Sequence, residues 1–442
     1  MGRKLGDASF GVFTFAYALA ALLTSLADFG QDKVLTREVA RDGGVLDRYF
    51  LNTLVLKLVV AVPALVVAAA VLAGIGRDGR TLGVVALLGA AVLVDLLTGT
   101  IYATFQAFER LEFVPVALIT ERFVTAAAGI VLLLLGAGVV AVSAVFLGGA
   151  LVAFALAARL LVRRVVRPRL WLEPSRWWPL MRAAAPIGLA GIAAVILFRV
   201  DTVMLAAFKP DAVVGNYGAA YRLFESTLFL SWAVGAAVYP VYSRRTGVPL
   251  AGVYERSLKL VVALVLPFAV GAAVLGHSVV HVLYGNDFDQ AGTALQLLSP
   301  AIVLYAISYL AGYLLVSQER PLVLTGVYSA IAVENVLANL VLIPAFSLNG
   351  AAVGTSVSEL LAAGALAWAA WGAGGTASLT RVFAGPALAG ALAAGAMWAL
   401  DGELAAAVAG GALVYAAALF VFERIVFPHD AVAIWSSLRR ST

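Results

Sequence analysis

The 442-residue chain is 63% hydrophobic and only 12% charged. A soluble globular protein would carry roughly twice that charged fraction, so the composition excludes a soluble fold and indicates a membrane protein. The absence of cysteine excludes disulfides, thiolate metal sites and iron–sulfur clusters. In a membrane protein, the net charge of +5 bears on the side where each charge lies and not on nucleic acid.

Apolar segments near 20 residues, the length that crosses about 30 Å of hydrocarbon as a helix, recur along the whole chain. They predict an all-α integral membrane protein with about thirteen transmembrane helices. The predicted spans are Phe10–Phe29, Phe50–Ile75, Thr81–Phe108, Phe113–Gly136, Val139–Ala158, Ala183–Ala207, Val213–Val241, Ser257–Leu283, Ala291–Val316, Pro321–Pro344, Asn349–Trp371, Val382–Leu400 and Leu404–Val426.

The chain contains an internal repeat. DASFGVFTFAYAL, which starts at Asp7, returns as DAVVGNYGAAYRL, which starts at Asp211, and the overlay pairs Gly11 with Gly215. It also pairs Phe13 with Tyr217 and Tyr17 with Tyr221. LKLVVA at 56–61 likewise returns at 258–263. Self-similarity in a hydrophobic chain is typical of transporters built from repeats, so we expect two pseudo-symmetric helical lobes.

The two copies differ at their beginnings. In the second copy the predicted helix Ala183–Ala207 precedes the motif, whereas the first copy reaches the motif within a few residues of Met1. We therefore expect the first lobe to lack its opening helix, with the chain starting about 25 to 35 residues downstream of the ancestral start. The alternative is a signal peptide over Gly2–Ala20, but the same segment recurs in mid-chain, where no signal peptide is expected.

These patterns predict four regions. Residues 1–158 form a truncated N-lobe of about five transmembrane helices, and 183–372 form a C-lobe of six. Between them, the basic and tryptophan-rich segment 159–182 is typical of an interfacial stretch on the cytoplasmic leaflet. Residues 373–442 add two further transmembrane helices and a cytoplasmic tail outside the repeat.

The distribution of Lys and Arg predicts the orientation. If the loop after the first span is cytoplasmic, twenty-two of the 30 basic residues, Lys57 among them, lie on the inner side and five on the outer side. This asymmetry follows the positive-inside rule. We expect the C-terminus to be cytoplasmic and the N-terminus to lie outside.

Ionisable residues inside predicted spans are the candidate functional residues, because an intramembrane charge is costly and usually faces a polar cavity. Arg199, Asp201, Arg222 and Glu225 are the candidate substrate-binding residues. The guanidinium groups of Arg199 and Arg222 have the forked donors that match phosphate oxygens. The alternative is a structural polar network between helices.

A second set of intramembrane charges could serve as gates, as ion or proton sites, or as ties between helices. It consists of Asp95, Glu121, Arg122, Glu334 and Glu359. His277 and His281 are spaced i, i+4, but no acidic or cysteine partner lies beside them, so we interpret them as an interfacial pair. We expect no metal, no cofactor and no catalytic site, since no nucleotide-binding loop or hydrolase spacing is present.

Several motifs resemble one known family when taken together in this order. They are ADFGQDKVLTREVARD at 27–42, FRVDTVML at 198–205, YRLFE at 221–225, VYPVYSRR at 238–245 and LYGNDFDQAGTALQLLSP at 283–300. The chain resembles the polysaccharide and oligosaccharide flippases of the multidrug, oligosaccharidyl-lipid and polysaccharide (MOP) exporter superfamily. The resemblance implies twelve core helices in two six-helix lobes, often with two more at the end. This sequence departs from that pattern by lacking the first helix.

The resemblance also implies a function. It predicts a non-enzymatic transporter of the cell membrane that moves a polyprenyl-linked oligosaccharide from the cytoplasmic to the outer leaflet by alternating access. Its expected partners are the lipid-linked oligosaccharide, membrane lipid and glycan-assembly enzymes, without nucleic acid, and the chain is expected to be a monomer. An ion-coupled drug or metabolite exporter of the same superfamily and a membrane glycan polymerase remain as alternatives.

Overall fold

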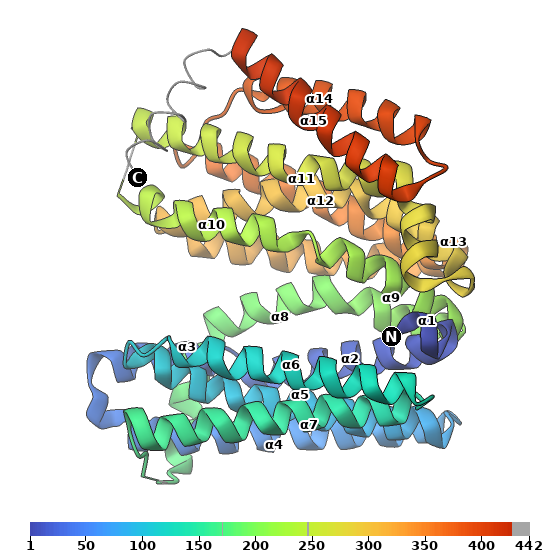
Figure 1. Cartoon of the computed structure of the whole chain (residues 1–442). Helices are drawn as coiled ribbons and strands as arrows, with labels where there is room; N and C mark the ends of the chain where they lie inside the picture. Colours follow the sequence, from blue (N-terminus) through green and yellow to red (C-terminus); the bar gives the residue numbers. More distant parts are fainter. Residues whose placement is uncertain (170, 245–246, 427–442) are drawn as a thin grey trace. The chain divides into compact units, whose positions relative to one another are not determined.

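The computed structural model describes residues 1–169, 171–244 and 247–426, and in these ranges the chain is helical without strands (Figure 1). This confirms the predicted all-α class. The helices of the first half are α1 (Gly2–Leu5), α2 (Asp7–Asp28), α3 (Gln31–Arg41), η1 (Gly43–Val45), α4 (Leu46–Gly74), α5 (Gly79–Ala107), α6 (Phe113–Leu134), α7 (Val139–Leu160), η2 (Leu161–Val165), η3 (Pro174–Arg176) and α8 (Trp177–Phe208). They are followed by α9 (Asp211–Glu225), α10 (Leu228–Ser243), α11 (Gly247–Tyr284), η4 (Asn286–Phe288), α12 (Asp289–Ser317), α13 (Pro321–Trp371), α14 (Leu379–Ala399) and α15 (Leu404–Val426).

The chain forms two compact units, Met1–Gly215 and Asn216–Thr442, whose boundary falls within α9. Helix α8 belongs to the first unit because it packs along α2 and α3. These units are defined by contacts, whereas the four predicted regions follow the repeat. The division into repeat lobes therefore stays a prediction.

Eleven helices in the described ranges are long and apolar enough to cross a membrane, against the thirteen spans that the sequence predicts. Two features of the backbone account for the difference. The predicted span Val213–Val241 is divided between α9 and α10, which are 15 and 16 residues long. The predicted spans Pro321–Pro344 and Asn349–Trp371 both lie in α13.

The break between α9 and α10 lies at two hydroxyl residues. The side chain of Ser226 donates a hydrogen bond to the carbonyl of Leu223, and that of Thr227 donates to the carbonyl of Phe224. Ser and Thr side chains that bond to nearby backbone in this way compete with the helical ladder. The predicted span Val213–Val241 therefore divides at Ser226 and Thr227 into two helices.

Helix α13 is a hairpin of two spans and not one straight helix. Its backbone leaves the helical region at Ser347, where φ is 59°. On either side of this kink, Asn339 lies against Gly354, and Ser358 donates a hydrogen bond of 2.8 Å to Glu334. These contacts run antiparallel, so the two halves of α13 lie side by side as the two predicted spans would.

The two copies of the repeated motif contact each other inside the first unit. A Cβ atom on Gly11 would overlap the carbonyl oxygen of Asp211, and one on Gly215 would overlap the carbonyl oxygen of Asp7. The overlay of the repeat pairs these same residues, so the contact is reciprocal, as at a two-fold axis. The glycines let the start of α2 and the start of α9 approach backbone to backbone.

Each copy buries the paired aromatic residue completely. Phe13 packs edge-on against Phe146 of α7, at 5.0 Å between ring centroids. The hydroxyl of Tyr217 lies 3.3 Å from that of Thr355 in the second half of α13. The paired positions thus have the same role in each copy, which is to anchor a helix through an aromatic ring.

The segment between α7 and α8 is held on α4 by hydrogen bonds, three of which involve one buried amide. Asn52 of α4 is 1% exposed, and its side chain donates a hydrogen bond of 3.0 Å to the carbonyl of Trp171. It also accepts hydrogen bonds from the backbone N–H of Glu173 at 2.9 Å and from the indole N–H of Trp177 at 3.0 Å. Trp171 itself is largely exposed, as an interfacial tryptophan would be. The predicted connector is therefore fastened to α4.

The helices beyond the repeat pack on the second unit. Both α14 and α15 lie along α11. The hydroxyl of Tyr415 donates a hydrogen bond of 2.9 Å to the carbonyl of Ala263. The ammonium of Lys259 forms an ion pair with Glu423 of α15. Lys259 is the counterpart of Lys57 in the repeated LKLVVA segment. The ion pair between Lys259 and Glu423 therefore connects α15 to a position that the repeat shares.

The glycine crossing gives a first prediction. Gly11→Ala should destabilise the chain by about 1–3 kcal/mol, because the added methyl meets backbone atoms that cannot rotate away. Thermal unfolding in detergent measures the effect. The control is Gly83→Ala on α5, whose added methyl would meet no atom within 4 Å. Equal unfolding temperatures for the two variants would contradict the crossing.

The Asn52 amide gives a second prediction. Asn52→Ala should lower the free energy of unfolding by about 1–3 kcal/mol, because buried partner groups lose their hydrogen bonds. Thr53→Val is a matched control: this neighbouring hydroxyl is buried, and the structure gives it no hydrogen bond to lose. Urea titration of both variants in detergent tests the difference, and a loss as large in Thr53→Val would refute the role of the amide.

Candidate functional site

A sharp corner between α2 and α3 places two carboxylates close together. Helix α2 ends at Asp28, and Phe29 and Gly30 follow in the left-handed region, with φ of 42° and 75°. The side chain of Asp28 accepts a 3.3 Å hydrogen bond from the backbone of Gly30. Because α3 then begins at Gln31, Asp32 lies in the first turn after the corner. Both acidic side chains can therefore reach the neighbouring helices.

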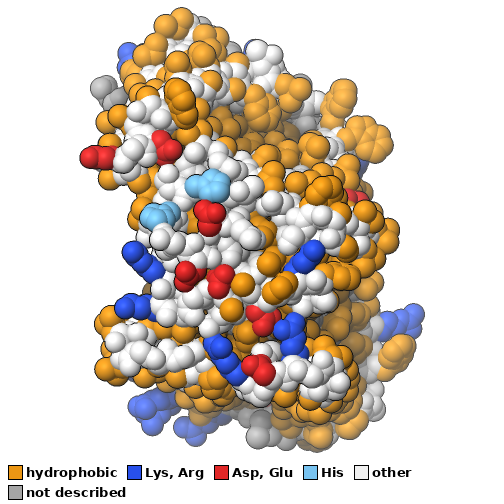
Figure 2. Space-filling view, turned by 90° about the vertical axis from the view of Figure 1, so that its right-hand side faces the viewer, with side chains coloured by type: hydrophobic (Ala, Val, Ile, Leu, Met, Phe, Trp, Pro, Cys, Tyr) orange, Lys and Arg blue, Asp and Glu red, His pale blue; other side chains and the backbone are white. Residues whose placement is uncertain are grey.

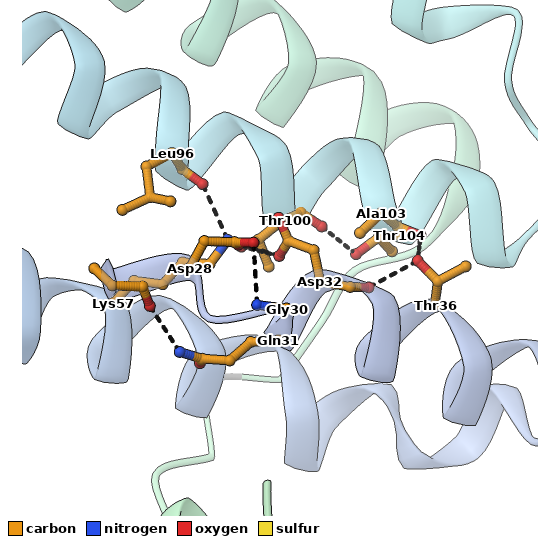
Figure 3. Close-up of polar contacts among 11 residues, drawn as sticks. Asp28, Gly30, Gln31, Asp32, Thr36, Lys57, Leu96, Thr100, Ala103 and Thr104 are labelled. Atoms are coloured by element: carbon orange, nitrogen blue, oxygen red, sulfur yellow. Dashed lines mark hydrogen bonds and ion pairs between the residues drawn. The ribbon is translucent and has the colours of Figure 1, made fainter. Parts of the chain in front are cut away.

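The ammonium of Lys57 on α4 lies among four oxygen atoms. Its distances are 2.9 Å to Asp28 and 2.7 Å to Asp32, both ion pairs. Its hydrogen bonds are 3.0 Å to the hydroxyl of Thr100 and 3.2 Å to the carbonyl of Leu96, both on α5. Figure 3 shows these groups converging from α2, α3, α4 and α5. Lys57 is fully buried, so every partner of its charge must come from the protein.

The charges of the cluster do not balance. Two carboxylates face one ammonium, and Thr100 donates a further 2.9 Å hydrogen bond to Asp32. Burial raises the pKa of the Asp32 carboxyl above its ordinary value, Lys57 opposes the rise, and Asp28 adds to it. Oxygen atoms thus surround the Lys57 ammonium, which occupies the space between them. The Asp32 carboxylate is the group in this cluster whose raised pKa favours taking up a proton.

The predicted substrate-binding residues are distributed over both units. In the first unit, the guanidinium of Arg199 lies over the ring of Tyr17, 5.7 Å from its centroid. Asp201 is fully buried and accepts a 2.6 Å hydrogen bond from the backbone of Thr202. In the second unit, Arg222 and Glu225 lie on α9, and both are partly buried. None of these four side chains is fully exposed, and their role as a binding site stays a prediction.

The predicted gate residues lie in two groups, and their role is also a prediction. In the first unit, Arg122 is 3.8 Å from Glu121, and Asp95 of α5 lies close enough to interact with both. Glu121 is mostly buried, whereas Arg122 is exposed. In the second unit, Glu334 accepts from Ser358 as described above, and Glu359 accepts a 3.3 Å hydrogen bond from Ser308. Glu334 and Glu359 thus join the halves of α13 to each other and to α12.

The two histidines of α11 are exposed. Figure 2 shows His side chains at the surface, with acidic side chains close to them. His277 lies 3.3 Å from the hydroxyl of Thr293 and 3.9 Å from the carboxylate of Asp289. Within 1–169, 171–244 and 247–426, no group of three or more His, Cys, Asp or Glu residues could hold a metal ion.

Comparison with known proteins assigns the family. The model of the family described as "Polysaccharide biosynthesis protein" matches residues 1–245, which is more than half of the chain. The chain belongs to this family. The resemblance found in the sequence motifs is thereby confirmed.

Two relatives of this family member come from Haloferax volcanii. The probable low-salt glycan biosynthesis flippase Agl15 is 22% identical over 362 residues, covering 80% of this chain and 75% of the relative. The probable flippase AglR is 26% identical over 168 residues, covering 36% and 35%. Both relatives have the names of flippases and not of enzymes.

Solved structures show which fold the family member has. The inward closed conformation of the lipid II flippase MurJ matches with a TM-score of 0.77 and 12% identity, covering 95% of this chain and 97% of that one. An inward-facing multidrug resistance MATE family transporter of the MOP superfamily matches with a TM-score of 0.68 and 16% identity, covering 83% and 91%. The chain therefore has the MOP transporter fold and is a multi-pass membrane protein.

Sequence reasoning missed the cluster around Lys57. It assigned Lys57 to the charges of the inner side and used Asp28 and Asp32 only as letters of a family motif. The available signal was a lysine inside an apolar span, which is costly unless it is paired. Finding its partners required the corner at Gly30, which the apolar pattern does not reveal.

A third prediction concerns the charge balance of this cluster. Lys57→Met should destabilise the chain by about 2–4 kcal/mol at neutral pH, because it leaves two partly buried carboxylates without their buried counter-charge. The triple variant Lys57→Met, Asp28→Asn, Asp32→Asn should recover most of the loss. Thermal unfolding in detergent compares the two variants, and failure of the triple variant to recover would indicate that packing and not charge matters.

The same variant has a predicted pH dependence. Removing Lys57 takes away the interaction that opposes the raised pKa of Asp32. A carboxyl whose folded-state pKa is raised costs stability that appears as the pH rises above its unfolded-state pKa and is complete above its folded-state pKa. The deficit of Lys57→Met should therefore be smallest near pH 4 and grow toward neutral pH, whereas a deficit independent of pH would contradict the assignment.

Proposed function

We propose that this chain is a transporter that moves a polyprenyl-linked oligosaccharide from the cytoplasmic to the outer leaflet by alternating access, for synthesis of surface polysaccharide or glycoconjugates. The observation that carries the proposal is the similarity, along 80% of the chain, to a relative named as a glycan biosynthesis flippase. The fold shared with a lipid II flippase supports it. In this proposal the chain is a carrier and not an enzyme.

The substrate contains a phosphate group that must pass through a low-dielectric region. Arg199 and Arg222 are the proposed phosphate contacts, since a guanidinium pairs with phosphate through two parallel donors. Asp201 and Glu225 lie two and three residues from these arginines, and we assign them to hold the guanidinium groups or accept from sugar hydroxyls. Arg199 is already oriented by the ring of Tyr17.

The protein environment follows from the same proposal. The chain lies in the cell membrane as a monomer with its C-terminus in the cytoplasm, as the distribution of basic residues predicts. The second group of charged residues, from Asp95 to Glu359, then serves as gates or ion sites. Glycan-assembly enzymes on the cytoplasmic side would deliver the substrate.

An ion-coupled exporter of drugs or metabolites is the second candidate. The match to a multidrug transporter with a TM-score of 0.68 favours it, because both functions use one fold. A fluorescent cation such as ethidium, loaded into proteoliposomes, separates the two. Export of ethidium without movement of a sugar lipid would select this candidate.

A fourth prediction tests the substrate site. Arg199→Ala and Arg222→Ala should each slow transbilayer movement of a labelled lipid-linked oligosaccharide at least tenfold in proteoliposomes, because a charged contact to phosphate is lost. Arg163→Ala in η2, an exposed cytoplasmic arginine, is the matched control. Protein content of the vesicles is measured in parallel. Full activity in both Arg199→Ala and Arg222→Ala would refute the assignment.

A further inference from the structure

Helices α10 and α12 of the second unit lie side by side and share a row of aromatic side chains. The row contains Trp232 and Tyr239 on α10 and Tyr305, Tyr309 and Tyr313 on α12. The tyrosines of α12 are spaced four residues apart, so they line one face of that helix. We call these five side chains the aromatic track.

The track is built as three successive rungs. In the first rung, the indole N–H of Trp232 donates a 2.8 Å hydrogen bond to the hydroxyl of Tyr305. In the second, Tyr309 lies against Gly235, where any side chain would collide with its ring. In the third, Tyr239 meets Tyr313 edge-on, at 5.6 Å between ring centroids. Because both helices advance together from rung to rung, they run parallel here.

The rings of α12 also contact one another along the track. Ring centroids are 5.5 Å apart between Tyr305 and Tyr309 and 4.9 Å apart between Tyr309 and Tyr313. The hydroxyl of Tyr309 donates a hydrogen bond of 3.2 Å to the hydroxyl of Tyr313. The result is one continuous aromatic surface edged by hydroxyl groups, held in place by its own contacts.

Part of this surface is open. Trp232 is 47% exposed and Tyr239 is 37% exposed, whereas Tyr305 behind them is 6% exposed. The N–H of Trp232 is bonded inward, so the orientation of the indole is fixed. A fixed, open aromatic face costs little entropy when a ligand stacks on it.

An aromatic belt does not explain the track. Belts place Trp and Tyr at the level of the lipid headgroups. Eight residues separate Tyr305 from Tyr313, which is about 12 Å along a helix, so the row extends into the depth of the membrane. At that depth the hydroxyls of Tyr305 and Tyr309 are hydrogen-bonded within the track, so the exposed rings of Trp232 and Tyr239 are the surface that a ligand would meet.

We propose that the aromatic track binds the sugar rings of the transported glycan by stacking. A pyranose ring has a face of C–H groups that packs on the electron-rich face of an aromatic ring, and its hydroxyls bond to groups at the edge. The row of three rungs accommodates successive sugars and is independent of the residues assigned to phosphate. This inference rests on the proposed function, since it names the part of the substrate that the second unit holds.

The test compares two probes that differ only in sugar. Farnesyl diphosphate, with and without an attached chitobiose, is titrated against the full chain in lipid nanodiscs. The dissociation constant of the probe without sugar, divided by that of the probe with sugar, measures how much the sugar strengthens binding. Trp232→Leu should reduce this ratio about tenfold, a loss of about 1.4 kcal/mol, and leave binding of farnesyl diphosphate unchanged. Tyr239→Leu should act in the same direction.

Two further variants sharpen the test. Trp368→Leu on α13 is the matched control, because this indole is 78% exposed but lies outside the track, and it should change neither constant. Tyr305→Phe keeps the ring and removes the acceptor of the Trp232 hydrogen bond. It should weaken sugar binding by less than Trp232→Leu.

The outcomes separate the track from the flippase proposal. Equal affinity of the wild-type chain for both probes, or an equal loss for both probes in Trp232→Leu, would overturn the track. Transbilayer movement of the chitobiose probe is measured separately in proteoliposomes. If the sugar-dependent binding is intact and the probe does not move, the flippase proposal fails and the track stands.

Discussion

A buried ammonium group joins four helices of the first unit, α2, α3, α4 and α5. Lys57 is inaccessible to water, so its charge is stable only because oxygen atoms from α2, α3 and α5 surround it. Those oxygens are in place only if the chain turns sharply at Gly30 and α5 runs alongside. The cluster thus fixes the corner, the register of α4 against α5 and the position of the acidic pair at once, whereas the apolar contacts around it are non-directional.

Most of the fold could be predicted from the sequence because hydropathy determines where a membrane helix lies. The two spans in α13 were predicted correctly although the helix is nearly continuous, since Pro344 and Asn349 mark the kink around Ser347. The break between α9 and α10 was missed, because a hydroxyl residue bonded to the local backbone can equally lie inside a continuous helix, as Ser299 and Ser308 do in α12. Hydropathy does not contain that information.

The candidate sites were less predictable, for a reason that Lys57 and Trp232 share. Each residue is conspicuous in the sequence, one as a charge in an apolar span and the other as a tryptophan in mid-helix. Their partners lie far away in the chain: Thr100 is on another helix from Lys57, and Tyr305 is 73 residues beyond Trp232. The tyrosines of α12 are spaced four residues apart and so share one face, but only tertiary structure shows what that face meets.

The repeat retains a lysine at the same position in both copies, yet its counter-ion differs. Lys57 is neutralised by acids within its own copy, while Lys259 is neutralised by Glu423, which the repeat does not contain. The second copy therefore has an ion pair that reaches outside the repeat, to α15. A chain shortened before Leu379 would lose this contact between α11 and α15, so the last two helices contribute charge pairing as well as apolar packing to the second unit.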